Sequence, residues 1–275
     1  MIGFWGGEEI AEEGESLLGE RIKKIYLYRR TIRDMAFSQL KAKYAGSLLG
    51  IFWAIINPLL IMFAITFVFK AVFKTQINNF AFFVLAGVFP WMFFSCAVSE
   101  AATSILSQQN VLRQFNLPRE IIPLSSILSN FANFLIGWIV VYPVFLFLNP
   151  KIIVFFPLLV VALILNLIFI CGLGVALAVL NVFFRDLGHL LGVLLMFWFW
   201  VTPVFYSMDM IPIKLYWIFQ INPMTAYIAF YREVIFKAGV PALTLFIQIF
   251  FWAFFSLSLG FLVFAQLESK ILKKV

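Results

Sequence analysis

The stretch that decides the fold runs from Asn181 to Phe236 and reads NVFFRDLGHLLGVLLMFWFWVTPVFYSMDMIPIKLYWIFQINPMTAYIAFYREVIF. Arg185 and Asp186 form a charged break, after which residues 187–206 are almost continuously apolar. As a helix this run is about 30 Å long, which matches the hydrocarbon core of a bilayer. The sequence therefore predicts a membrane-spanning helix over residues 187–206.

Two shorter apolar segments follow this predicted span. Residues 211–221 and 224–236 are separated by Asn222-Pro223, and as helices they are only roughly 16 to 20 Å long. Neither can cross a bilayer alone, so we expect a re-entrant hairpin over residues 211–236. Irregular backbone at such depth is tolerated where protein or a water-filled cavity covers it. This pattern favours the mouth of a transport pathway over a simple anchor.

The composition indicates that the whole chain is a helical membrane protein. Of its 275 residues, 64% are hydrophobic and 12% are charged, and the mean hydropathy is +1.02. A soluble domain of this length could not bury so much apolar surface. The apolar runs are continuous rather than alternating, which disfavours an outer-membrane barrel. The net charge of +7 is attributed to basic loops that set topology, and not to a nucleic-acid partner.

The remaining segments complete an all-α, polytopic fold with six predicted transmembrane helices. Residues 1–20 form an acidic leader, residues 46–267 the transmembrane domain and residues 268–275 a basic tail. Between leader and domain, residues 21–45 predict an amphipathic helix with one basic face, which is typical of the membrane interface; the alternative is a plain positively charged flank. The other five predicted spans are residues 47–69, 80–104, 124–148, 152–182 and 243–265.

Charge counting orients this layout. With the N-terminus inside the cell, 14 of the 20 lysines and arginines lie on the cytoplasmic side, so both termini are predicted to be cytoplasmic. Glu100 lies inside the second span, where a carboxylate is costly. It has either a transport role or a simple hydrogen-bonded position near the interface. The polar segment 108–120 predicts a short surface helix that turns back into the membrane.

Residues that carry enzyme chemistry are scarce. His189 is the only histidine, and no cluster of residues has the spacing of metal ligands. The phosphate-binding pattern GxxxxGK[ST] is missing. We therefore expect no catalytic residue, no metal site and no bound cofactor in this chain.

Short motifs along the chain resemble those of ABC-2 type exporter permeases, in the same order and over residues 25–267. The resemblance is closest to the polysaccharide exporters of that family, which move lipid-linked O antigen or teichoic acid. One departure is the additional Asn116-Leu117, where many relatives have phenylalanine directly before proline. The motifs are Arg33-Asp34, Lys43-Tyr44, Ser47-Leu48-Leu49-Gly50, Trp53, Asn57-Pro58, Phe115-Asn116-Leu117-Pro118, Ile121-Ile122-Pro123, Phe184-Arg185-Asp186, Thr202-Pro203-Val204-Phe205-Tyr206 and Asn222-Pro223.

The resemblance implies partners and places for the candidate residues. Two permeases would pair, and each would dock a separate ATPase subunit that binds ATP and Mg²⁺. Residues 108–120 would be the coupling helix, with the interface helix beside it, and the hairpin would form an outer gate. The candidate coupling residues are Arg113, Gln114, Phe115, Asn116, Leu117, Pro118, Arg119 and Glu120.

The first and fifth spans would line a channel between the two protomers. Aromatic rings there could stack on sugars, although such rings also occur in interfacial belts and on lipid-facing surfaces. An arginine at the cytoplasmic mouth could bind a pyrophosphate head group, or could be a solvated loop residue. The candidate channel residues are Trp53, Asn57, Phe197, Trp198, Phe199, Trp200 and Tyr206, and those at the mouth are Arg33, Asp34, Arg185 and Asp186.

The function predicted from these observations is the permease subunit of an ATP-driven exporter of lipid-linked polysaccharide in the bacterial cytoplasmic membrane. One alternative is an ABC-2 permease for a drug or small lipid. The other is a membrane-embedded enzyme that transfers glycans, which would need acidic or metal-binding loop motifs that the sequence lacks.

Overall fold

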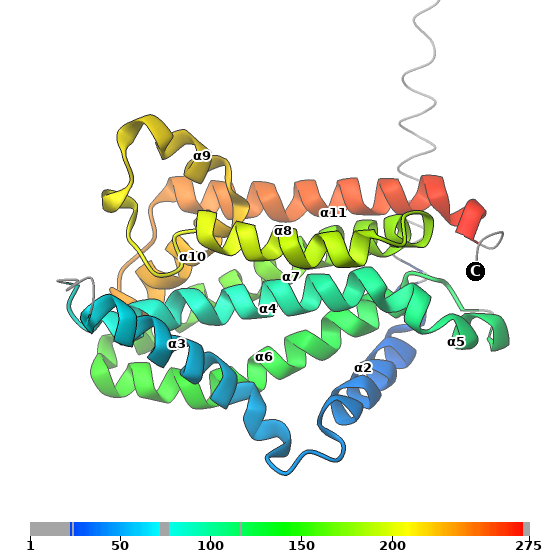
Figure 1. Ribbon diagram of the computed structural model, residues 1–275, viewed down its shortest axis with the longest axis horizontal. Helices are drawn as coiled ribbons and strands as arrows, with labels where there is room; N and C mark the ends of the chain where they lie inside the picture. The colour runs from blue at the N-terminus through cyan, green and yellow to red at the C-terminus, as the bar shows by residue number, and fades with distance from the viewer. Residues whose placement is uncertain (1–22, 24, 72–76, 116, 272–275) are drawn as a thin grey trace, which may run out of the picture.

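The computed structural model describes residues 23, 25–71, 77–115 and 117–271, and the elements in this part of the chain are helical (Figure 1). Short 3-10 helices lie at Gly50–Phe52, Pro150–Phe155, Met208–Met210 and Ile213–Leu215, and a π-helix at Arg232–Phe236. The α-helices are α2 (Arg29–Tyr44), α3 (Trp53–Ala71), α4 (Phe80–Ser107), α5 (Gln109–Gln114), α6 (Ile121–Leu148), α7 (Phe156–Phe183), α8 (Leu187–Val201), α9 (Tyr216–Ile221), α10 (Pro223–Tyr231) and α11 (Leu243–Ile271).

Five helical segments in the described part of the chain are long and apolar enough to cross a membrane. They confirm the prediction of an all-α, polytopic membrane protein. Their bounds are Gly50–Ala71, Phe80–Ser107, Ile121–Leu148, Pro150–Phe183 and Leu243–Glu268.

The predicted fifth span is shorter in the structure than in the sequence analysis. Helix α8 has 15 residues and ends at Val201, so it is only about 22 Å long, and residues 202–206 are not helical. Thr202 has extended backbone angles, because the ring of the following Pro203 disfavours the helical conformation at the residue before it. The end predicted at Tyr206 is therefore wrong, and a count of six spans stays a prediction.

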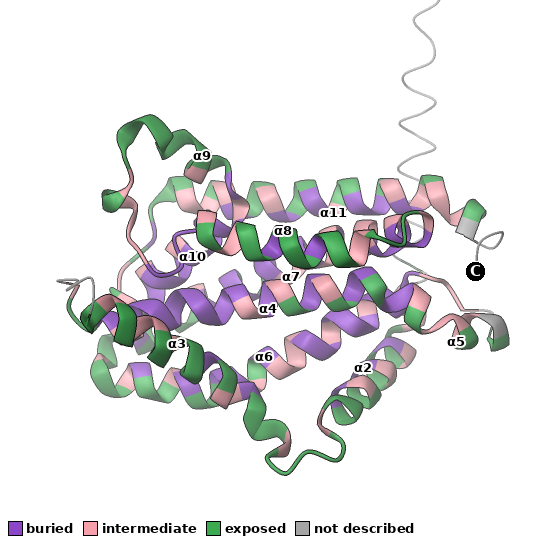
Figure 2. Ribbon diagram, in the orientation of Figure 1, coloured by how far each residue is buried: buried purple, intermediate pink, exposed green. Residues whose placement is uncertain are grey.

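Helix α4 is the centre of the bundle. In an 18-residue apolar stretch of α4, 72% of the residues are buried, against 11% in the corresponding stretch of the α3 span, Gly50–Ala71 (Figure 2). It packs against α3, α6, α7 and α10. Helices α7 and α11 lie close together because glycines meet at their crossing: a Cβ at Gly172 would collide with the backbone of Ser256, and one at Gly260 with the backbone of Gly172. Such small residues let helices in a membrane approach closely.

Residues 211–236, predicted as a re-entrant hairpin and called the hairpin below, have an exposed first part and a buried second part (Figure 2); their re-entrant course in a membrane stays a prediction. Helix α9 has no buried residue, whereas seven of the nine residues of α10 are buried. The side chain of Asn222 accepts a hydrogen bond from the backbone N–H of Met224 at 3.0 Å and so caps α10. The Asn222-Pro223 break that the sequence predicted is therefore a helix start.

Helix α2 is amphipathic, while a position at the membrane interface stays a prediction. Ile32, Ala36 and Leu40 are spaced four residues apart and are its buried residues, which is the pattern of one helical face. This face packs on α6, and Figure 1 shows α2 and α5 at the same end of the bundle.

Candidate functional site

A polar cluster joins α2 to the centre of the bundle. Lys43 Nζ lies 2.7 Å from Glu100 Oε1 and donates to Asn130 Oδ1 at 3.0 Å. The amide nitrogen of Asn130 donates in turn to Glu100 Oε2 at 2.7 Å. Each of the three side chains thus binds the other two, and they come from α2, α4 and α6. Glu100 is hydrogen-bonded near the end of its span, which is one of the two possibilities left open by the sequence.

Two further hydrogen bonds reinforce this attachment of α2. Gln39 donates from Nε2 to Ser125 Oγ at 3.0 Å, and the hydroxyl of Tyr44 donates to Asn133 Oδ1. Burial raises the pKa of the Tyr44 phenol above its ordinary value, so the hydroxyl keeps its proton and remains a donor. Sequence reasoning missed these pairs because the partners lie more than 80 residues apart.

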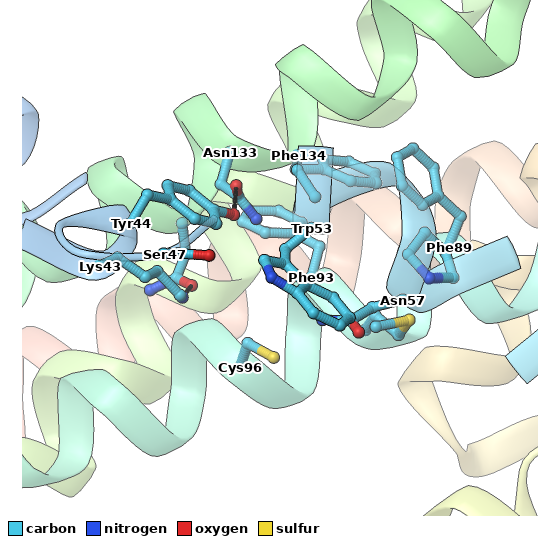
Figure 3. Close-up of a pocket in the computed structure, with 14 residues that line it drawn as sticks. Lys43, Tyr44, Ser47, Trp53, Asn57, Phe89, Phe93, Cys96, Asn133 and Phe134 are labelled. Atoms are coloured by element: carbon cyan, nitrogen blue, oxygen red, sulfur yellow. Dashed lines mark hydrogen bonds between the residues drawn. The ribbon is translucent and has the colours of Figure 1, made fainter. Parts of the chain in front are cut away.

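A cavity of about 380 Å³ opens beside the polar cluster, between the end of α2 and helices α3, α4 and α6. Figure 3 shows Lys43, Tyr44 and Ser47 at one end of it and Phe89 at the other. The charged Lys43 thus lies at one end, whereas Asn57 adds a polar amide nearer the end where Phe89 lies. The lining residues are Lys43, Tyr44, Ser47, Trp53, Ala54, Asn57, Pro58, Phe89, Met92, Phe93, Cys96, Asn130, Asn133 and Phe134.

The residues predicted to line a channel fall into three pairs, with Tyr206 apart from them. Trp53 and Asn57 both line this cavity. Trp198 and Phe199 have rings packed against Trp91. Two others are exposed on the surface of α8, Phe197 to 67% and Trp200 to 60%, while Tyr206 donates from its hydroxyl to the Trp200 carbonyl at 3.0 Å. A lumen lined by these residues stays a prediction.

Asn222 ties the hairpin to the end of α8. Its Oδ1 accepts from Trp198 Nε1 at 2.9 Å, and its Nδ2 donates to the hydroxyl of Thr202 at 2.9 Å. Together with its role as the cap of α10, this uses both ends of the amide. The motif Thr202-Pro203 and the motif Asn222-Pro223 are therefore in contact, although 20 residues separate them.

Arg232 is a buried charge that sequence reasoning missed. Its Nη1 and Nη2 donate to the carbonyls of Pro203 and Val204 at 2.6 and 2.5 Å. Longer bonds of 3.4 Å reach Phe83 and Tyr206, and the guanidinium lies 3.6 Å above the Phe83 ring. The signal was a single arginine inside the apolar segment 224–236, where a charge is costly unless it has a specific partner.

The predicted coupling segment is only partly helical. A short helix lies in this segment as predicted, but α5 ends at Gln114 and Phe115 has extended backbone angles, so the helix does not extend to residue 120. The ring of Pro118 restricts the residue before it to extended conformations, which prevents a continuous helix. Asn116 lies outside the described residues, and Glu120 is buried. Arg119 donates to the backbone carbonyl of Glu268 at 2.7 Å.

A largely apolar groove of about 420 Å³ lies between α2 and the α5 segment. Phe115 is 58% exposed at its edge. The groove is lined by Thr31, Met35, Ser38, Gln39, Gln108, Val111, Phe115 and Leu117.

The residues predicted at the cytoplasmic mouth are exposed. The guanidinium of Arg33 binds its neighbour Asp34 at 3.0 Å. Arg185 and Asp186 lie in the turn between α7 and α8. Their role at a mouth stays a prediction.

Comparison with known proteins places these features in a family. Residues 32–236 match the family model described as ABC-2 type transporter. The chain is 32% identical to an O-antigen export system permease protein RfbA of Klebsiella pneumoniae over 200 residues, which are 71% of this chain and 76% of that protein. It is 30% identical to the O-antigen export system permease protein RfbA of Myxococcus xanthus over 229 residues, which are 80% of this chain and 85% of that protein.

Proposed function

The chain belongs to the ABC-2 type transporter family, and from this premise we propose that it is the permease subunit of an ATP-driven exporter of lipid-linked polysaccharide. The observation that carries the proposal is the similarity to permeases named for O-antigen export, over more than two thirds of both chains. The substrate is O antigen or a similar glycan. The membrane is the bacterial cytoplasmic membrane, with both chain termini on the cytoplasmic side.

The partner that supplies ATP hydrolysis is a separate ATPase subunit, which binds ATP and Mg²⁺. The groove between α2 and the α5 segment supports this part of the proposal. Its exposed surface is largely apolar, and Phe115, which is itself exposed, belongs to its lining. An aromatic side chain of this kind is a typical anchor in a protein interface.

A second copy of the chain completes the transport path. Support comes from α3 and α8, whose apolar surfaces are largely uncovered. Only 11% of the residues in the apolar stretch of the α3 span are buried, and in α8 only Leu191 and Leu195 are buried. Lipid or another copy can cover such surfaces. Two copies facing each other through α3 and α8 would enclose a channel, with one ATPase subunit bound to each.

The test is purification of the chain from its native membrane in mild detergent. We expect a subunit with an ATP-binding motif to co-purify in equal amount. Phe115→Ala should weaken binding of the ATPase subunit by about 2 kcal/mol, or roughly 30-fold, which is the typical effect of an alanine substitution at an interface hot spot. The matched control is Phe147→Ala, because Phe147 is 90% exposed near the C-terminal end of α6. Purification of the chain without any ATP-binding subunit would overturn the proposal.

A further inference from the structure

We propose that the cavity between α2, α3, α4 and α6 binds a single neutral sugar ring of the exported glycan. The inference rests on the proposed function, because it assigns the substrate a subsite inside one protomer. It adds the site, its residues and its preference for an uncharged head group. The cavity of about 380 Å³ is within the size range of small-molecule sites.

Unused hydrogen-bonding groups are the first argument. Within the part of the chain that the structure describes, the amide of Asn57 makes no hydrogen bond, while Asn133 uses its oxygen for Tyr44 and keeps its NH₂ group for a ligand. Ser47 accepts from the backbone N–H of Gly50 at 3.2 Å, which leaves its hydroxyl proton to donate. An amide offers a donor and an acceptor together, as the hydroxyl groups of a sugar require. Ser47 and Asn57 are exposed and Asn133 is half-buried, so solvent can satisfy these groups when the cavity is empty. A purely apolar occupant would displace that solvent and leave them without partners, which is costly.

Trp53 and Asn57 are the second argument. They lie four residues apart on α3, so their side chains share one face of the helix, and both line the cavity (Figure 3). An indole face can cover the apolar C–H face of a sugar ring while the amide one turn away binds a hydroxyl. Phe93 and Phe134 also line the cavity, and their rings are stacked on each other with centroids 4.6 Å apart.

The charge balance at the polar end is the third argument. Lys43 is the cation that lines the cavity, and its Nζ is 2.7 Å from Glu100 and 3.0 Å from Asn130. An anionic head group would have to compete with Glu100 for this ammonium. A neutral ring leaves the pair intact, so the geometry favours a glycosyl unit over a phosphate.

The experiment uses the full chain in phosphatidylcholine nanodiscs. The probes are glucosyl- and galactosyl-diacylglycerol, diacylglycerol and phosphatidic acid, each with a photoactivatable diazirine in the acyl chain close to the head group. Mass spectrometry identifies the labelled peptides. We expect the two glycolipids to label peptides that contain residues 53–58 and 130–134, more strongly than the other two lipids do.

Variants separate the sugar contacts from nonspecific labelling. Trp53→Leu and Asn57→Leu should each lower glycolipid labelling roughly three- to tenfold, the usual effect of one lost contact of this kind, and the conservative Trp53→Tyr and Asn57→Gln should retain part of it. Trp217→Leu is the control, because Trp217 is exposed on α9 and does not line the cavity. If a leucine variant elutes as an aggregate, the conservative variant carries the comparison.

Any of four results would overturn the inference. Equal labelling by diacylglycerol would mean an apolar slot, and stronger labelling by phosphatidic acid would mean an anion site at Lys43. Absent glycolipid labelling, or labelling unchanged in the Trp53 and Asn57 variants, would exclude a sugar site here. The co-purification of an ATPase subunit is measured separately, so a failed subsite and a failed exporter function give different results.

Discussion

Replacing Arg232 by methionine tests whether this one side chain holds the hairpin against the end of α8. Arg232 carries two short hydrogen bonds, to the carbonyls of Pro203 and Val204 at 2.6 and 2.5 Å. Hydrogen bonds to a charged group contribute about 1.5 to 3 kcal/mol each, so the two together contribute about 3 to 6 kcal/mol. Methionine preserves much of the volume and removes the charge.

Part of this loss is recovered, because the variant no longer buries a guanidinium. Interhelical hydrogen bonds inside membranes are also often weaker than such sums suggest. We therefore expect Arg232→Met to lower the free energy needed to separate the hairpin from α8 by about 2 kcal/mol. This corresponds to a roughly 30-fold larger population of the open state.

The assay is the rate at which a thiol reagent labels a cysteine at position 204. Val204 is fully buried, so Val204→Cys reacts when the hairpin separates from α8. Cys96 and Cys171 are replaced by alanine to remove the other thiols. When opening and closing are fast relative to labelling, the rate follows the open population, and Arg232→Met should raise it roughly 30-fold.

The matched control is Lys237→Met. Lys237 also belongs to the segment after α10, but its ammonium is exposed and binds Glu233 at 2.6 Å on the surface. Such a pair contributes about 0.3 to 0.5 kcal/mol, so labelling should change about twofold. If Arg232→Met changes the rate by less than threefold, the carbonyl contacts do not hold the hairpin and the reasoning fails.

Three further outcomes follow from the same contacts. Gly87→Ala should open the same interface, because its Cβ would lie 2.6 Å from the Val204 carbonyl oxygen; position-204 labelling measures this. A double-mutant cycle of Lys43→Met and Glu100→Gln should give a coupling of up to about 1 kcal/mol in thermal unfolding, smaller at high salt, because both side chains are partly exposed. Tyr44→Phe should cost about 1 kcal/mol through its lost bond to Asn133. Because the pKa of Tyr44 is raised, its hydroxyl stays protonated at every pH below the ordinary tyrosine pKa. The destabilisation by Tyr44→Phe should therefore be equal at pH 7 and pH 9, and it should disappear only at higher pH.

Most of the fold could be predicted because each long membrane helix corresponds to one continuous apolar run of residues. Length and hydropathy identified the five long spans, and the separation of basic and apolar residues in 21–45 indicated that α2 is amphipathic. Two errors lie near prolines. Pro203 ends α8 before Thr202, and Pro118 disfavours the helical conformation at Leu117, so the coupling segment cannot be one helix; hydropathy does not register either effect. The end of α5 at Gln114 is not explained by a proline.

The candidate site was less predictable, because its residues meet only after folding. Trp53 and Asn57 were selected by resemblance, and the structure adds that they share a cavity with Asn133. The sequence showed that the carboxylate of Glu100 lies within a span, where a charge is energetically unfavourable. Its partner Lys43 lies 57 residues away, on a helix outside the spans. No periodicity in either segment identifies such a pair.

The same contacts connect the two ends of the proposed pathway. The groove proposed for the ATPase lies between α2 and the α5 segment, and α2 is held to α4 and α6 by Gln39, Lys43 and Tyr44. Lys43 and Tyr44 also line the cavity proposed for the sugar ring. A displacement of α2 by an ATPase subunit would therefore move the polar end of that cavity directly. If the cluster transmits this motion, Lys43→Met should reduce export while leaving the ATPase subunit bound, whereas Phe115→Ala should release it.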